Sequence, residues 1–148
     1  MADAIFTRRS NAPIWFYAVA LIAGLWNAMG ALDYTMTKLE VEAYLASMSE
    51  AQSAYFTSFP VWYTAVWAIA VWSALAASVL LLLKQKLAAP LFLVSTAFFL
   101  ISAAYLYGFT AAADMMGAGG AAFSAVIFAS LVFLWWFSRF SETRSWLR

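Results

Sequence analysis

The sequence predicts an all-α integral membrane protein, built as an antiparallel four-helix bundle. Of its 148 residues, 66% are hydrophobic and only 10% are charged, whereas soluble domains are roughly half apolar and about a quarter charged. A chain this short has too little interior to hide so much apolar surface from water. Four uncharged apolar runs and a one-sided distribution of basic residues support the same conclusion. We therefore treat residues 1–148 as one membrane domain.

Each apolar run is long enough to cross a bilayer, because a hydrocarbon core about 30 Å thick needs about 20 residues of helix. Pro13 and Pro60 open the first two runs, and Pro90 lies in the first turn of the third. At such positions the backbone N–H has no helical partner, so proline is tolerated. The predicted spans are 13–32, 60–83, 88–110 and 121–137.

The basic residues predict the orientation of these spans. The side opposite the termini carries a single basic residue, Lys38. Loops rich in Lys and Arg stay in the cytoplasm, so both termini are predicted to be cytoplasmic. The basic residues on the side of the termini are Arg8, Arg9, Lys84, Lys86, Arg139, Arg144 and Arg148.

The outer connection between the first two spans, residues 33–59, is predicted to hold one or two short amphipathic helices. Thr37-Lys38-Leu39-Glu40 and Ser49-Glu50-Ala51-Gln52 both fit the capping-box pattern that starts a helix. Such helices would lie on the outer surface as a lid over the bundle. An ordinary solvated connector is the alternative. The apolar residues at helical spacing are Val41, Tyr44, Leu45, Met48, Tyr55 and Phe59.

Small residues recur every four positions on three of the predicted helices. Helix association in lipid depends on close backbone approach, which small side chains permit. We therefore expect these ridges to pack inside the bundle, and contacts between two copies of the chain are the alternative. The ridges are Ala20, Gly24 and Ala28 on the first helix, Ala70, Ala74 and Ser78 on the second, and Ala121, Ala125 and Ala129 on the fourth.

Polar residues gather where the first span reaches the outer side, in the segment LWNAMGALDY. Asn27 lies roughly 20 Å along the helix from Pro13, within the outer part of the hydrocarbon core. An amide there needs a partner, because an unmatched polar group in hydrocarbon costs several kcal/mol. The predicted partners lie on the outer half of the third span, with Asp114 following that span, and Thr64 on the second span lies at similar depth. The candidate residues of the third span are Ser102, Tyr105, Tyr107 and Thr110.

Two interpretations of these polar residues stay open. In the first, they form an outward pocket for a sugar or another neutral polyol, which needs aromatic rings beside hydrogen-bonding groups. In the second, Asn27 joins two helices, the carboxylates lie in headgroup water and the tyrosines anchor the interface. The pocket would be lined by Asn27, Asp33, Tyr34, Tyr105 and Asp114, and rimmed by Trp26 and Trp62.

The composition argues against most enzyme classes. The chain has no histidine and no cysteine, which removes the usual haem, zinc and thiolate ligands and the ordinary proton shuttle. We expect no enzyme activity, no cofactor, no metal site and no nucleic-acid partner. The favoured function is a non-enzymatic accessory or structural membrane component, alone or in a larger membrane complex. The alternative is a carrier or binding protein for a small, sugar-like solute that acts as a homodimer.

Three stretches carry a resemblance to a known family. They are LWNAMGALDYTMT, FPVWYTAVWAIAVWSALAASVLLLLKQKLAAP and the final aromatic, basic helix. Together they resemble a family of small, uncharacterised four-span inner-membrane proteins of proteobacteria, some of which bear a sugar-transporter-like label. The resemblance implies four spans and a bacterial inner membrane. It carries over no functional residues.

Overall fold

The computed structural model describes residues 11–148 and confirms the four-helix bundle. Four of its helices are long and apolar enough to cross a membrane, so the chain is a small multi-pass membrane protein. Arg8 and Arg9, on which part of the predicted orientation depends, lie outside the described residues. In order along the chain the helices are α1 (Ile14–Lys38), α2 (Glu42–Leu45), α3 (Glu50–Thr57), α4 (Val61–Leu82), α5 (Ala88–Phe109) and α6 (Ala112–Thr143).

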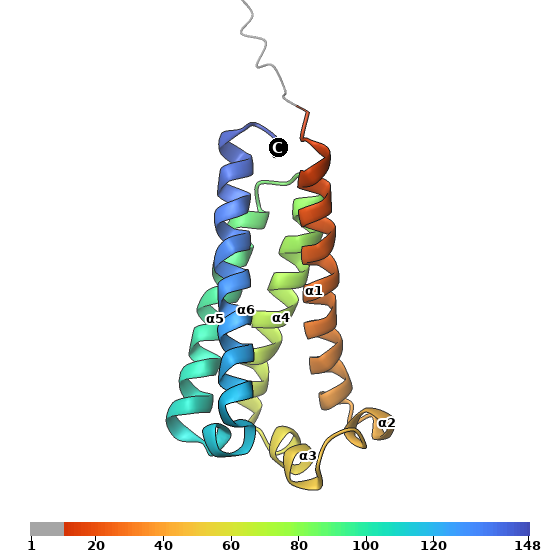
Figure 1. Ribbon diagram of the computed structural model, residues 1–148, viewed down its shortest axis with the longest axis vertical. Coiled ribbons are helices and arrows are strands. Elements are labelled where there is room, and N and C mark those ends of the chain that lie inside the picture. The colour runs from red at the N-terminus through yellow and green to blue at the C-terminus, as the bar shows by residue number, and fades with distance from the viewer. Residues whose placement is uncertain (1–10) are drawn as a thin grey trace, which may run out of the picture.

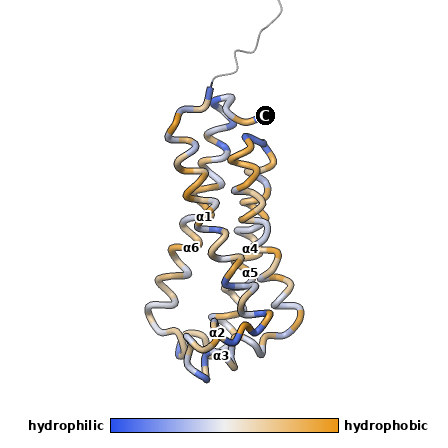
Figure 2. Tube along the Cα trace, turned by 90° about the vertical axis from the view of Figure 1, so that its right-hand side faces the viewer, coloured by the Kyte–Doolittle hydropathy of each residue, from blue (hydrophilic) through white to orange (hydrophobic). Residues whose placement is uncertain are grey.

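The two ends of the bundle differ in what they hold (Figure 1). The described chain enters and leaves at one end, which we call the terminal end and which also holds the turn between α4 and α5. The short helices α2 and α3 lie at the opposite end, which we call the loop end, with the turn between α5 and α6. Figures 1 and 2 both show the long helices spreading apart toward the loop end.

The terminal end is closely packed. Phe16, Leu81 and Phe92 are fully buried there, and Phe137 stacks on Phe16 with 5.7 Å between ring centroids. This cluster joins α1 and α6, which are the first and last spans. Helix α4 packs against α1 and α5, and α5 packs against α6.

The segment after α6 folds back over the terminal end. Arg148 N–H donates to the carbonyl of Lys84 at 2.6 Å, and Lys86 N–H donates to the carbonyl of Arg148 at 2.9 Å. Leu147 is buried in the core cluster, and the Trp146 ring packs on Phe16 with 5.9 Å between centroids. The turn between α4 and α5 is therefore tied to the end of the chain.

The outer connection contains two short helices, as predicted, but the first span is longer than predicted. Helix α1 continues past residue 32 to Lys38, and Thr37 is buried in its last turn instead of starting a new helix. The capping box predicted at Thr37 is therefore wrong. The one at Ser49 is confirmed, since Gln52 N–H donates to Ser49 Oγ and Ser49 N–H donates to Gln52 Oε1.

The helix that contains the fourth span also starts earlier than predicted: α6 begins at Ala112. It contains a kink at Gly117. Gly117 has φ 58° and ψ −161°, a conformation that is essentially restricted to glycine. Gly120 follows close to the kink, where an added Cβ would lie 2.4 Å from Met116 Cβ. The glycines allow one turn of helix at the loop end to join the span directly.

Two of the three small-residue ridges lie inside the bundle. Ala20, Ala70, Ala74 and Ser78 are buried, and an added Cβ at Gly24 would lie 3.7 Å from Leu82 Cδ1. The third ridge is different, because Ala121, Ala125 and Ala129 are exposed. Larger residues occupy the inner face of α6 instead, namely Ile127, Leu131, Leu134 and Phe137. The α6 ridge therefore does not contribute to internal packing.

Candidate functional site

A cavity of about 430 Å³ occupies the half of the bundle nearest the loop end. Its wall is formed by all four long helices, with Phe56 of α3 and Phe59 at the loop end. The cavity begins where the close packing of the terminal end stops, near Ala74 and Leu131. It is therefore the space left by the spreading helices.

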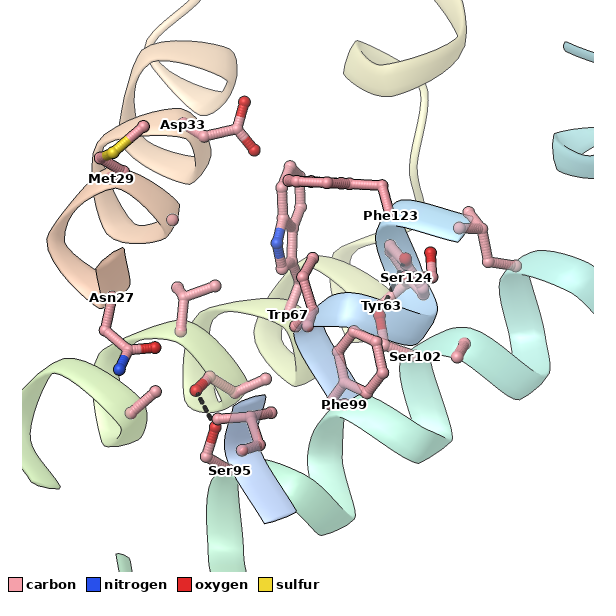
Figure 3. Close-up of a pocket in the computed structure, with 18 of the residues that line it drawn as sticks. Asn27, Met29, Asp33, Tyr63, Trp67, Ser95, Phe99, Ser102, Phe123 and Ser124 are labelled. Carbon is pink, nitrogen blue, oxygen red and sulfur yellow. Dashed lines mark hydrogen bonds between the residues drawn. The ribbon is translucent and has the colours of Figure 1, made fainter. Parts of the chain in front are cut away.

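Aromatic side chains form much of the wall. Tyr63 and Trp67 come from α4, Phe99 from α5 and Phe123 from α6, and Figure 3 shows them around one common space. The Trp67 ring is fixed from outside by Tyr34, which meets it edge-on with 5.0 Å between centroids. The wall is thus mainly apolar and rich in aromatic rings.

The hydroxyl groups of the wall are mostly engaged with protein groups. Helical spacing places Ser95 and Ser102 on one face of α5, beside α4, and Ser124 on α6 lies opposite Tyr107. Such pairing satisfies polar groups that a membrane would otherwise leave without partners. The pairs are Ser95 Oγ with the Ala70 carbonyl at 2.7 Å, Ser102 Oγ with the Tyr63 hydroxyl at 2.9 Å, and Tyr107 OH with Ser124 Oγ at 2.8 Å.

Asn27 lies at the deep side of the cavity and joins α1 to α4, so the prediction of a partner on the third span is wrong. Its Nδ2 donates to Ser78 Oγ at 2.9 Å and to the Ala23 carbonyl at 3.0 Å. The side chain is only 8% exposed, and it also contributes to the cavity wall. The two interpretations of Asn27 drawn from the sequence are therefore compatible, because the same amide links two helices and lines the cavity.

Asp33 supplies the negative charge of the cavity. It is the one charged side chain that lines the cavity among residues 11–148, and Figure 3 shows its carboxylate pointing from α1 toward the cavity. The Tyr44 hydroxyl, on α2, donates a hydrogen bond to Asp33 Oδ1. Partial burial, this hydrogen bond and the negative charge of Asp33 raise the pKa of Tyr44 to about 12. Tyr44 therefore stays a neutral donor at physiological pH.

Lys38 closes the loop end above the aromatic wall. Its Nζ donates to the Phe56 carbonyl at 3.1 Å, which ties the end of α1 to α3. The same ammonium lies 5.6 Å from the centroid of the Phe59 ring and 5.9 Å from that of Trp67. On the other side of α3, the Tyr55 hydroxyl shares a hydrogen bond with Thr110 Oγ1, after α5. Helix α3 is thus attached to both sides of the bundle and covers the cavity.

The cavity opens sideways between α1 and α6. Met29 and Phe123 both line it, yet their side chains are 65% and 59% exposed. Below this mouth, toward the terminal end, Trp26 Nε1 donates to Ser130 Oγ at 3.2 Å. The Trp26 ring also meets Phe123 edge-on, with 6.1 Å between centroids. With the four long helices spanning a bilayer, this mouth would face lipid.

The structure brings only part of the sequence-predicted pocket to the cavity. Trp26, Asn27 and Asp33 line it, whereas Asp114 is exposed away from it. Tyr34 supports Trp67 from outside. Trp62 and Tyr105 pack on each other instead, with 4.6 Å between ring centroids, and are not part of the wall.

Several residues of the wall had not been predicted, notably Trp67, Phe99 and Tyr107. One signal for them was present on α5, where Ser95, Phe99 and Ser102 recur at helical spacing and so share a face. On α4 the same spacing was present, because Tyr63, Trp67 and Ala70 share a face, whereas the tryptophans taken alone, Trp62, Trp67 and Trp72, spread around the helix. Only Trp67 of these three reaches the cavity.

No family model, curated protein or solved structure matches this chain. The cavity itself offers groups suited to binding: aromatic faces, a buried amide at the deep side and a carboxylate at the mouth. A molecule with an apolar body and one polar end would meet each of these groups with a matching part.

Proposed function

We propose that this multi-pass membrane protein binds a small amphipathic molecule and does not convert it. The observation that carries the proposal is the cavity of about 430 Å³, which all four spanning helices line. Ligand sites typically measure about 300–1,000 Å³ and combine an apolar wall with a few placed polar groups. The cavity has both properties.

A bacterial inner membrane with cytoplasmic termini is part of the same proposal. Seven of the eight basic residues fall on the side of the termini, and such asymmetry is typical of cytoplasmic loops. The resemblance of the LWNAMGALDYTMT segment to small inner-membrane proteins implies the same membrane, although no family model matches this chain. The loop end, with α2 and α3, would then face outward, and the cavity would lie in the outer half of the bilayer.

An amphipathic ligand is favoured over a polyol because the hydroxyl groups of the cavity wall are already hydrogen-bonded to other protein groups. Ser95 and Ser102 donate to protein acceptors, and Tyr107 and Ser124 share a hydrogen bond. A sugar would have to break these bonds or leave its own hydroxyls unmatched, and both are costly away from water. The sugar-like ligand remains the alternative, and a comparison of sugars with amphiphiles in the same assay separates the two.

Native mass spectrometry after gentle extraction from the membrane tests the proposal. A cavity-filling substitution, Gly30→Phe, supplies the negative control, because an added Cβ at Gly30 meets nothing within 4 Å and Gly30 lines the cavity. Gly108→Phe is the matched substitution, since Gly108 has equal space but is not part of the wall.

We expect a co-purifying small molecule with the wild-type protein and with Gly108→Phe, and its loss from Gly30→Phe. The tryptophans Trp26 and Trp67 line the cavity, so their fluorescence should respond to the same molecule when it is added back. A bound molecule that survives in Gly30→Phe, or its absence from all three proteins together with no fluorescence response to added amphiphiles, contradicts the proposal.

A second candidate function is an accessory subunit, either of a homodimer or of a larger membrane complex. The exposed ridge Ala121, Ala125 and Ala129 on α6 favours it, because small residues at regular spacing allow another helix to approach closely. The chain has no cysteine, so Ala125→Cys introduces a single cross-linking site. A disulfide dimer formed in native membranes would indicate two copies of this chain, and a cross-link of another mass would indicate a different subunit.

A further inference from the structure

We propose that the ligand of the cavity is a lipophilic organic cation, with its charge beside Asp33 and its apolar body against the aromatic wall. This inference rests on the proposed binding function and adds the charge of the ligand to it. The wall itself carries a negative charge. Asp33 is the only charged side chain that lines the cavity in residues 11–148, and it is negative.

The Asp33 carboxylate keeps capacity for a cation. Among the described residues its hydrogen-bond donor is the Tyr44 hydroxyl, which engages Oδ1, and a carboxylate offers about four acceptor sites in all. Tyr44 is neutral, so the negative charge is not cancelled. Asp33 is exposed, and near a protein surface the effective dielectric constant is still lower than in bulk water, which strengthens the attraction of an opposite charge and the repulsion of a like one.

The aromatic wall adds a second attraction for positive charge. The faces of aromatic rings carry a negative electrostatic potential and attract ammonium and similar groups within about 6 Å. This chain already shows the effect in its own side chains, because the Lys38 ammonium lies 5.6 Å from Phe59 and 5.9 Å from Trp67. Phe59 and Trp67 both line the cavity.

Lys38 is the opposing charge, and its position limits its effect. It does not line the cavity, its Nζ donates to the Phe56 carbonyl, and two ring faces share its charge. Asp33, in contrast, points its carboxylate toward the cavity (Figure 3). A ligand in the cavity therefore meets the carboxylate in the wall, whereas the ammonium is not part of the wall. Removal of the Lys38 charge should strengthen the binding of a cation.

The sideways mouth explains why the cation should be lipophilic. Met29 and Phe123 flank the opening and are largely exposed, so a molecule enters past apolar side chains at the depth of the membrane. Organic cations with apolar groups gather at this depth, because their apolar part enters the hydrocarbon while the charge stays at the interface. Small hydrated cations do not follow this route.

Two ions of equal shape and opposite charge test the inference: tetraphenylphosphonium and tetraphenylborate, added to the full-length protein in nanodiscs of zwitterionic lipid. Binding is followed by tryptophan fluorescence, and Gly30→Phe corrects for partition into lipid. We expect saturable binding of the cation that is at least about tenfold tighter than that of the anion, as a close carboxylate and aromatic faces together should produce. Benzyltrimethylammonium and its uncharged carbon analogue repeat the comparison with a smaller molecule.

Three substitutions test which side chains cause the preference for the cation. Asp33→Asn should remove the preference for the cation, Asp33→Glu should retain it, and Lys38→Met should strengthen cation binding. Asp114→Asn is the matched control, since it removes an exposed carboxylate outside the wall and should leave the preference unchanged. Thermal unfolding of each variant shows whether it has folded, and the Asp33→Glu variant keeps the test valid if Asp33→Asn is unstable.

The possible failures are distinguishable from one another. Equal saturable binding of both ions, blocked by Gly30→Phe, would overturn the cation preference while the cavity kept its binding function. Tighter binding of the anion, reversed by Lys38→Met, would overturn the inference, because the charge of Lys38 and not that of Asp33 would then determine which ion binds. If none of these four compounds binds, the inference is overturned. A small molecule retained in native mass spectrometry would then still support the proposed function. If no fluorescence response and no retained molecule are found, both the cation preference and the proposed binding function are overturned.

Discussion

The terminal half and the loop half of the bundle are made from the same four helices, yet one is filled and the other is hollow. At the terminal end Phe16 and Phe137 are almost completely buried and stack on each other. At the loop end Phe123 is also part of the interior wall, but it is 59% exposed and borders a cavity. Similar side chains therefore have different surroundings along one helix, α6.

The difference follows from what joins α1 to α6. At the terminal end the segment after α6 folds back, and Trp146 packs against Phe16. Near the middle, Trp26 and Ser130 provide a hydrogen bond. Beyond that point α1 continues to Lys38 and is attached to α3 instead of α6. Helices α1 and α6 can spread apart there because their side chains are attached to other helices: Tyr34 of α1 packs on Trp67 of α4, and Ser124 of α6 is hydrogen-bonded to Tyr107 of α5.

The largest expected effect comes from removing an aromatic ring in the filled half. Phe137→Ala should lower the free energy of unfolding by about 3 kcal/mol, since the neighbours cannot collapse into the space left by a well-packed ring. Phe123→Ala should cost less than about 1 kcal/mol, because this ring already borders empty space and lipid. Unfolding of both variants in the same membrane mimetic measures the difference, and equal losses would contradict the comparison.

The kink of α6 should be the next most sensitive feature, and it belongs to the hollow half. Gly117→Ala forces a residue with a Cβ into φ 58° and ψ −161°, at a cost of about 2 kcal/mol. Gly119→Ala is the control, because an added Cβ there meets nothing within 4 Å. We expect Gly117→Ala to unfold earlier and Gly119→Ala to be unchanged or slightly more stable. Equal stability of the two variants would show that the kink is not required.

Asn27 lies at the boundary between the two halves, and its removal should have a moderate effect. Asn27→Leu loses the hydrogen bond to Ser78, and such bonds between helices in membranes are worth about 1 kcal/mol. The double variant with Ser78→Ala should be little worse than either single variant, because both remove the same bond. Strict additivity of the two losses would show that the bond does not contribute.

The smallest expected effect is a gain in the stability of the filled half. Ser141 Oγ is buried with no hydrogen-bond partner among the described residues, so Ser141→Ala should stabilise the protein by up to about 1 kcal/mol. Ser138 is equally buried, but its Oγ donates to the Leu134 carbonyl at 2.8 Å. Ser138→Ala should therefore be neutral or slightly destabilising. A thermal melt that ranks the two variants in the opposite order would contradict this account.

Sequence reasoning determined the features that depend on composition and on local signals. The number of spans and the antiparallel arrangement follow from uncharged apolar runs, which only a bilayer can accommodate as separate helices. The start of α3 at Ser49 follows from a capping box, and the close contact of α1 with α4 follows from small residues at regular spacing. Asp33 and Asn27 were recognised because polar groups in or near a hydrocarbon core are rare.

The tertiary structure alone decided which faces of the helices point inward. Helices that are apolar nearly all round carry little periodic signal for their rotation, because lipid and protein interior are equally acceptable to an apolar side chain. Only the structure shows that Trp67 lies in the cavity wall while Trp62 and Tyr105 lie outside it, and that the α6 ridge lies on the surface. Residues of all four long helices form the cavity together, so no single segment of the sequence predicts it.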